Sequence, residues 1–397
     1  MADRLTDIIC GLPLHVLTCL EKNEGRALAA AEPARARAGV RQAVRGAPWP
    51  RELRGQMVAA FELDLEHPTG LARLASGNLI VGDYHRCELV EFTPGGAVVR
   101  RIKAPGDVRR PTAVLAAVVP ENGAPAERLY VACAAERRVV EFRGGRAVRH
   151  FGQPRPARFS EVLPADRFRL PRSMAIWRRA GAADFDGARE PLLIIVDVEG
   201  RRVTAWRLNG DLWGILGDSA GAAGAPDAPD ALGVPDAPDA PDASFAIYYP
   251  RTALSVGAHL VVFDSPSRDN HTLSPLRVQV LAWGRRAPAV VYSLLVPGRM
   301  YEISAEYMPL DREDAFGDSQ TQTQTQNWTS GRIVASDASG NRVLVFAWRP
   351  HSPVMLELVH VFGGFPVLSM PWGIAVTADS VWVVNTGNKQ VCVFEAQ

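Results

Sequence analysis

The chain has 397 residues, 47% of them hydrophobic and 22% charged, with a formal net charge of +1. This composition is typical of a soluble globular protein with a large core, and the near-zero charge argues against a whole-chain preference for polyanions. No stretch approaches ~18 consecutive apolar residues, so no membrane-spanning helix is predicted. The early acid Asp3 argues against a secretory signal, and five scattered cysteines without a CxxC pair indicate reduced thiols in an intracellular protein.

The N-terminal segment, residues 3–47, is rich in Ala, Arg and Leu. It predicts two or three short helices interrupted at Gly11, Gly25 and Pro33. We expect residues 1–50 to form a small helical unit apart from residues 51–397. The pair Leu12-Pro13, followed by Leu/Ala/Arg-rich helices, resembles an F-box. That resemblance implies docking on the adaptor of a cullin-type ubiquitin ligase, and the alternative is a helical extension that only packs on the rest of the chain.

A repeated unit organises the remainder of the chain. A short apolar strand pattern ends in a small or acidic residue and is followed nine positions later by an aromatic residue. The matches are Asp83 to Phe92, Cys133 to Phe142, Asp197 to Trp206, Asp337 to Phe346 and Asn385 to Phe394. A sixth copy, Asp264 to Trp283, fits if ten residues around SPSRDNHTLSP are an inserted loop. Alternating apolar residues between these anchors predict strands, and a unit copied along the chain predicts a repeat architecture.

Most units also begin with a proline that opens another apolar run. These prolines are Pro68, Pro111, Pro171, Pro250 and Pro371. Proline suits the first residue of a strand, where its missing donor costs little. The fifth unit lacks this proline, and we expect its first strand at residues 300–307. Because a further apolar run follows each aromatic anchor, each unit is expected to hold four strands.

Two of the units, MPWGIAVTADSVWVVNTGNKQVCVF and HPTGLARLASGNLIVGDYHRCELVEF, resemble NHL repeats. The resemblance extends over roughly residues 57–397, with insertions in the third, fourth and fifth units. It implies an all-β fold, a six-bladed β-propeller, and the six units agree with this number. The Cys/His spacing of a RING or B-box, which accompanies NHL repeats in animal ubiquitin ligases, is absent from the sequence.

Closure of such a ring needs one further strand, because the sequence ends just after the third strand of the last unit. Residues 57–65 alternate apolar Phe61, Leu63 and Leu65 with acidic residues and are expected to supply it. Closure by both ends of the chain leaves only short, protected edges. Low-complexity tracts at residues 224–243 and 320–326 predict disordered insertions near 218–244 and 311–330.

One face of the propeller is expected to carry the binding site, because the inner strands begin there, around the channel mouth. The candidate partner-binding residues are Arg172, Arg251, Trp372, Tyr301, Thr69, Thr112, Arg86 and Lys389. Cations beside aromatic rings suit an acidic protein or peptide partner, and single-stranded RNA is the alternative. The structural alternative for Arg86, Arg137, Arg201, Arg342 and Lys389 is ion pairing with the acidic residues that end the second strands.

The sequence gives less support for a catalytic or metal-binding site. A zinc site needs three convergent imidazoles, yet only His67 and His85 fall near the expected mouth. The residues Asp83, Asp197, Asp264, Asp337 and Asn385 occupy equivalent points that suit calcium, but carboxylates there also cap turns. GxSxG, P-loop and HExxH motifs are absent. We therefore predict a monomeric, non-catalytic interaction scaffold without cofactor or metal, with a metal-dependent lyase or hydrolase as the alternative.

Overall fold

The computed structural model describes residues 55–103, 107–121, 124–153, 164–178, 191–216, 247–265, 275–283, 288–296, 303–309, 330–377 and 379–395. The helical unit expected at residues 1–50 lies outside this part of the chain. The expected insertions near 218–244 and 311–330 also lie outside it, apart from Ser330. Within the described residues, no helix is both long enough and apolar enough to cross a bilayer.

The described strands form six four-stranded sheets, each of which is one blade. Blade 1 holds β2 (Pro68–Arg73), β3 (Leu79–Asp83), β4 (Glu88–Phe92) and β5 (Val98–Ile102). Blade 2 holds β6 (Pro111–Glu121), β7 (Ala124–Cys133), β8 (Arg138–Arg143) and β9 (Arg146–Phe151). Blade 3 holds β10 (Pro171–Trp177), β11 (Leu192–Asp197), β12 (Arg202–Arg207) and β13 (Leu212–Leu216).

The remaining blades follow the same order. Blade 4 holds β14 (Tyr249–Val256), β15 (His259–Ser265), β16 (Leu276–Trp283) and β17 (Pro288–Val296). Blade 5 holds β18 (Ile303–Pro309), β19 (Gly331–Asp337), β20 (Arg342–Trp348) and β21 (Leu356–Gly363). Blade 6 holds β22 (Pro371–Val376), β23 (Ser380–Asn385), β24 (Gln390–Glu395) and β1 (Met57–Phe61), with the short helix η1 (Thr386–Asn388) between β23 and β24.

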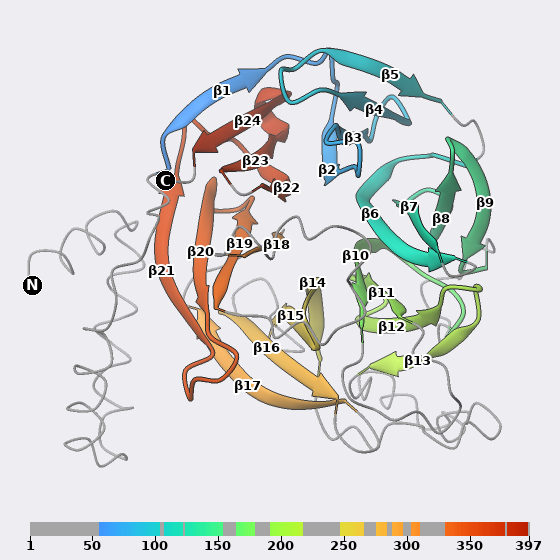
Figure 1. Ribbon diagram of the computed structural model, residues 1–397, viewed down its shortest axis with the longest axis vertical. Helices are drawn as coiled ribbons and strands as arrows, with labels where there is room; N and C mark the ends of the chain where they lie inside the picture. Colours follow the sequence, from blue (N-terminus) through green and yellow to red (C-terminus); the bar gives the residue numbers. More distant parts are fainter. Residues whose placement is uncertain are drawn as a thin grey trace, which may run out of the picture. The chain divides into compact units, whose positions relative to one another are not determined.

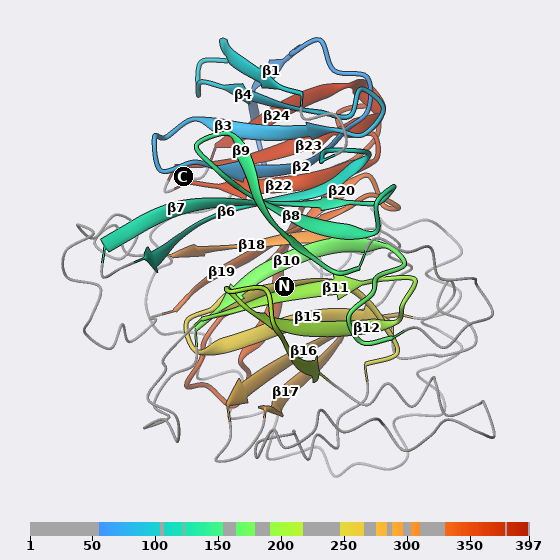
Figure 2. The same cartoon turned by 90° about the vertical axis from the view of Figure 1, so that its right-hand side faces the viewer.

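The blades close into a ring around a central channel (Figure 1). The innermost strands contact one another in the order β2, β6, β10, β14, β18 and β22, and β22 returns to β2. Seen from the side, the blue strands of blade 1 and the red strands of blade 6 lie near the top, the green strands of blades 2 and 3 in the middle, and the yellow and orange strands of blade 4 below (Figure 2). The protein is thus an all-β, six-bladed propeller, as the repeat predicts.

The ring is closed by β1, the strand expected from the N-terminal side. It pairs antiparallel with β24, from Met57 opposite Phe394 to Phe61 opposite Val391. The strand ends at Phe61, four residues short of the expected segment, and Leu63 and Leu65 continue as buried residues beyond it. Blade 6 therefore combines residues from both ends of the described chain.

Strand register confirms five of the six anchor pairs and corrects the sixth. Asp83 pairs with Glu88, five positions on, and the other regular blades share this step. In blade 4, Asp264 pairs with Arg277, so the inserted loop is eight residues long and not ten. Leu281, opposite Leu260, therefore occupies the place of the aromatic residue expected at Trp283. The first strand of blade 5 is β18, which begins three residues later than expected.

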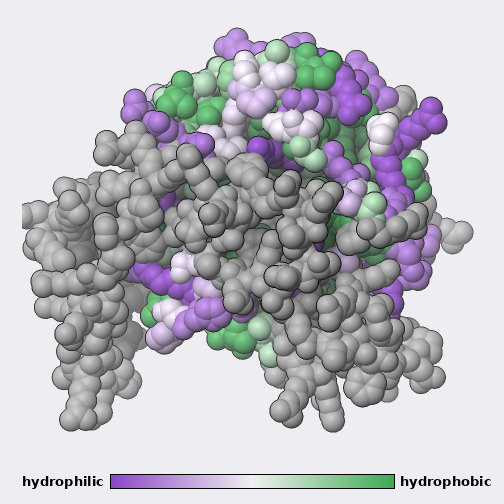
Figure 3. Space-filling model, in the orientation of Figure 1, coloured by the Kyte–Doolittle hydropathy of each residue, from purple (hydrophilic) through white to green (hydrophobic). Residues whose placement is uncertain are grey.

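The core lies between blades. Among the described residues, the buried apolar side chains form six clusters, and each cluster combines residues of two neighbouring blades. The aromatic anchors belong to these clusters, because a side chain every second residue faces the adjacent sheet. The outermost strands β9 and β17 instead alternate exposed and part-buried residues. Figure 3 accordingly shows hydrophilic and hydrophobic surface mixed along the upper rim of the ring.

Candidate functional site

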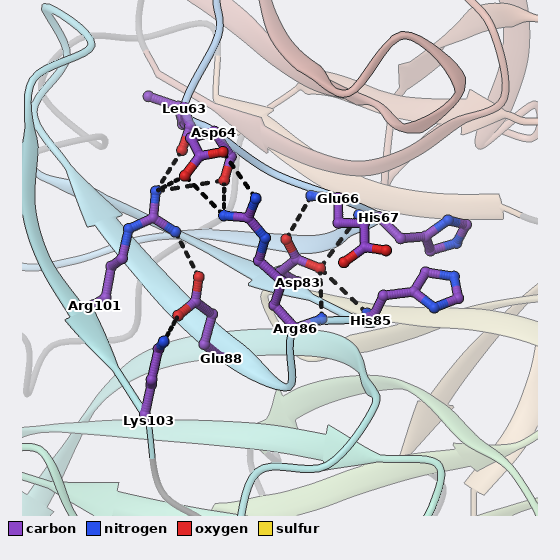
Figure 4. Close-up of polar contacts among 10 residues, drawn as sticks. All are labelled: Leu63, Asp64, Glu66, His67, Asp83, His85, Arg86, Glu88, Arg101 and Lys103. Atoms are coloured by element: carbon purple, nitrogen blue, oxygen red, sulfur yellow. Dashed lines mark hydrogen bonds and ion pairs between the residues drawn. The ribbon is translucent and has the colours of Figure 1, made fainter.

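The channel-mouth face is built from the turns between the second and third strands and from the segments that lead into the innermost strands. In blade 1 the buried carboxylate of Asp83 joins these two parts (Figure 4). It accepts hydrogen bonds from the backbone N–H groups of Glu66 (2.7 Å) and His67 (3.2 Å) on one side. On the other side it accepts from His85 (3.2 Å) and Arg86 (3.1 Å). The two segments of the mouth are therefore fixed to each other.

The same connection recurs in other blades. Asp197 accepts hydrogen bonds from the backbone N–H groups of Arg169, Leu170 and Gly200. The amide oxygen of Asn385 accepts one from Ser369 at 2.7 Å. The residues that share the equivalent points of the repeat thus cap backbone donors, which is the structural role expected for them.

These turns also share a backbone conformation that the sequence did not reveal. The residue just before the third strand has a positive φ, between 52° and 57°, in five blades. These residues are Cys87, Arg137, Arg201, Asn341 and Lys389. A residue with a Cβ adopts the left-handed region at a cost of roughly 1–2 kcal/mol. In blades 1, 3, 5 and 6 the anchor that opens the turn is an aspartate or asparagine side chain, which helps to hold it.

Several arginines of the third strands pair with the aspartates, and Arg342 is the one among them that the structural alternative names. The Arg342 guanidinium lies 2.8 Å from Asp337 and the Arg277 guanidinium 2.5 Å from Asp264. Burial raises the pKa of both aspartates, so these are buried pairs rather than the solvated pairs expected. Arg86 pairs instead with the exposed Asp64 at 2.8 Å, and its hydrogen bond and charge lower the pKa of that carboxyl.

Two of the expected binding residues meet at the centre of the face. The Arg172 guanidinium lies 4.6 Å from the centre of the Trp372 ring. Arg172 belongs to β10 of blade 3 and Trp372 to β22 of blade 6, which stand opposite each other in the ring. The contact therefore spans the channel. Arg251 of blade 4 lies over the Tyr249 ring at 4.3 Å, and Arg201 of blade 3 lies 5.6 Å from the same ring.

Below this contact the channel is narrow. Residues of all six blades line a cavity of about 40 Å³, among them Gly70, Thr112, Arg172, Arg251, Ser304 and Trp372. A cavity of this size holds a few water molecules.

Aromatic side chains extend the mouth over blade 1. The His67 ring lies 6.2 Å from the Trp372 ring and 4.9 Å from the His85 ring. Tyr84 adjoins both histidines, and the Arg110 guanidinium lies 5.7 Å from the Tyr84 ring. The sequence correctly placed His67 and His85 near the mouth. Across the described residues, no three His, Cys, Asp or Glu side chains come together as a metal-binding group.

The remaining expected site residues divide into three kinds. Thr69 and Thr112 are buried, and Thr112 lines the channel cavity. Their hydroxyls donate to the carbonyls of Pro111 and Pro171 in the next blade, both at 2.7 Å, so they join neighbouring blades. Lys389 is exposed in its turn. Tyr301 lies outside the described residues.

Tyr84, Arg110 and Tyr249 are mouth residues that sequence reasoning missed. Tyr84 follows the anchor Asp83, and Arg110 immediately precedes Pro111. Tyr249 likewise stands directly before Pro250. Inspecting the residue after each acidic anchor and the residue before each opening proline would have identified them.

Another ionisable group of blade 5 is Glu306 in β18. Its carboxylate accepts a hydrogen bond from the Val376 N–H of blade 6 at 2.8 Å. Burial raises the pKa of Glu306 to about 8, against the opposing charge of Arg73. This carboxyl therefore keeps its proton near neutral pH.

One family model and several solved structures are similar to this chain. The NHL repeat model matches residues 368–394, so the last blade contains an NHL repeat. Among solved structures, a streptogramin B lyase is 9% identical, with a TM-score of 0.45 over 85% of this chain and 97% of that one. Virginiamycin B lyase from Staphylococcus aureus is also 9% identical, with a TM-score of 0.45 over 85% of this chain and 98% of its own. A gluconolactonase-like protein is 13% identical, with a TM-score of 0.47 over 88% and 93%. The comparison with curated protein sequences gives no match.

Proposed function

We propose that this protein is a non-catalytic interaction scaffold whose channel-mouth face binds an acidic segment of a protein partner. The observation that carries the proposal is the stacking of Arg172 on Trp372 across the mouth, at 4.6 Å. The planar guanidinium of arginine matches the geometry of a carboxylate, and an aromatic ring beside it offers apolar contact area. Arg251 over Tyr249 repeats the arrangement in blade 4.

The charge distribution of the face supports the same partner. The aspartates of the turns are buried and occupied by backbone donors or by arginines of their own blade. Arg172 and Arg110 of the same face stack on aromatic rings. An acidic segment would meet stacked cations at the centre of the face and aromatic rings beside them.

The test is affinity capture from native lysate with the full-length chain. We expect Arg172→Glu with Arg251→Glu to reduce capture of the partner by about tenfold or more, since truncating a central cation at an interface costs on the order of 2 kcal/mol. Because Arg251 is buried, Arg172→Gln serves as a milder variant that removes the charge and keeps the length. Circular dichroism establishes that each variant is folded.

Arg146→Glu is the matched control, because Arg146 is exposed at the start of β9, at the opposite end of blade 2 from the mouth. If every captured protein stays bound to the folded Arg172 and Arg251 variants, the face is not the binding site. Capture of RNA in place of protein, lost with the same variants, would favour single-stranded RNA as the ligand. Ubiquitin-ligase subunits retained only when residues 1–50 are present would support the adaptor role of that segment.

A further inference from the structure

The loop between blades 5 and 6 presents apolar side chains to solvent on the channel-mouth face. It runs from Gly364 to Met370, between the end of β21 and the start of β22. Phe365 is 78% exposed, Val367 44% and Met370 46%. We call these three side chains the apolar rim. An exposed group of large apolar residues is a mark of an interaction surface.

The backbone of this loop is held in place. The Leu368 N–H donates to the Gly364 carbonyl at 3.0 Å, and the buried Leu368 side chain anchors the loop in the core between blades 5 and 6. The side-chain amide of Asn385 donates to the Val367 carbonyl at 2.9 Å. The Met370 N–H donates to the side-chain oxygen of Asn341 at 2.8 Å. A braced loop cannot fold Phe365 back into the core, so its exposure is part of the folded structure.

The apolar rim is continuous with the channel mouth. Met370 stands two residues before Trp372, which stacks on Arg172. On its other side lies the turn of blade 6, where the Asn388 side chain donates to the Pro366 carbonyl at 3.3 Å. Next to Asn388 is the exposed Lys389, the single charged residue among positions 364–377 and 385–390. Within these two segments the charge is therefore positive.

We propose that the apolar rim is a second contact for the partner segment bound at the mouth, and that this segment carries a bulky apolar residue beside its acidic residues. The inference rests on the proposed function, because the acidic part must lie over Arg172 for the apolar residue to reach the rim. A peptide suits the rim better than RNA. Lys389 alone neutralises few phosphates, and among the three rim side chains only Phe365 offers a ring on which a base could stack.

The probe is a phage-displayed library of random peptides, selected on the full-length protein. We expect the enriched peptides to combine Asp or Glu with a Leu, Phe or Trp. Synthesised and labelled with a fluorophore, they are titrated by fluorescence anisotropy against Phe365→Ala, Val367→Ser and Arg172→Gln. Each rim variant should weaken binding by about tenfold, the usual cost of losing a central apolar contact. Leu295→Ala is the control, because Leu295 is a similarly exposed apolar residue on β17, the outermost strand of blade 4.

The outcomes separate the two proposals. Peptides that bind the rim variants as tightly as the wild type but lose affinity for Arg172→Gln would overturn the rim contact and leave the mouth as the binding site. Peptides that are insensitive to all three variants, or a selection without enrichment, would overturn both. A labelled oligouridylate that binds more tightly than every selected peptide, and loses affinity for Phe365→Ala, would overturn the peptide as occupant of the rim.

Discussion

At the scale of single residues, the mouth depends on a buried acceptor that serves several backbone donors. Asp197 illustrates the energetic cost of burying a carboxylate. Burial raises the pKa of its carboxyl, although backbone hydrogen bonds and the charge of Arg202 oppose the rise. A buried charge is tolerated where donors surround it. Asn385, which occupies the equivalent point in blade 6, indicates that an uncharged acceptor also fits.

Replacing Asp197 by Ala should leave the N–H groups of Arg169, Leu170 and Gly200 without this acceptor. We expect the free energy of unfolding to fall by about 3 kcal/mol, since several buried donors lose their partner together. Asp197→Asn should lose clearly less, because the amide oxygen remains. Urea unfolding followed by tryptophan fluorescence measures both. The control is Glu199→Ala, an exposed change two residues away; an equal loss in that variant would contradict the role given to Asp197.

Glu306 predicts a pH dependence of stability. Its pKa is about 8 in the folded protein and near 4.5 ordinarily, so the folded state binds more protons between these pH values. The free energy of unfolding should therefore fall as the pH rises from about 5 to 8, by on the order of 2 kcal/mol, since the side chain is only partly shielded from solvent.

Glu306→Gln keeps an acceptor for the Val376 N–H and removes the titration, so its stability should change less over the same pH range. The measurement is urea unfolding of both proteins at several pH values. Parallel curves for wild type and variant would show that Glu306 does not titrate in this window. Glu357→Gln, at an exposed glutamate of β21, should follow the wild type.

At the scale of strands, the sequence predicted those features of the fold that recur in every repeat. The anchors Asp83 and Phe92 recur at one spacing, so the blades, their strands and the closing strand followed from the sequence. Leu281 broke the pattern in blade 4, because an insertion and a missing aromatic coincided there. The burial of Thr69 and the contact between Arg172 and Trp372 depend on neighbouring and opposite blades. Sequence spacing carries no information about such contacts until the ring is built.

The closing strand β1 gives the prediction at this scale. Phe61 stacks on Trp382 of β23, with ring centres 5.8 Å apart, and also contacts Gly96 in the last turn of blade 1. Phe61→Asp removes this packing and places a charge between two blades, which should cost about 3 kcal/mol. Glu62→Ala is its neighbour control; Glu62 is exposed and its loss should cost less than about 0.5 kcal/mol. Similar midpoints in urea for the two variants would mean that β1 is not packed as described.

At the scale of the whole molecule, the propeller is a closed array of similar units. Every blade shares one core cluster with the blade before it and another with the blade after it. An open array of repeats can lose its last unit and leave the rest folded, because each unit depends only on its neighbours. A ring has no last unit. Thr386 of blade 6 shows the connection directly, since its hydroxyl donates to the Pro68 carbonyl of blade 1 at 2.8 Å.

Removing residues 55–65 therefore tests closure itself. The deletion removes β1 and also Leu63 and Leu65, which pack between blades 6 and 1. We expect the urea midpoint of the entire propeller to fall in one transition, and amide hydrogen exchange to accelerate in blades 1 and 5 as well as in blade 6, because β22 contacts both β2 and β18. Two separate transitions, with blades 2 to 4 keeping the wild-type midpoint and protection, would instead indicate that the blades are stabilised pairwise and that closure by β1 stabilises only the sheet it joins.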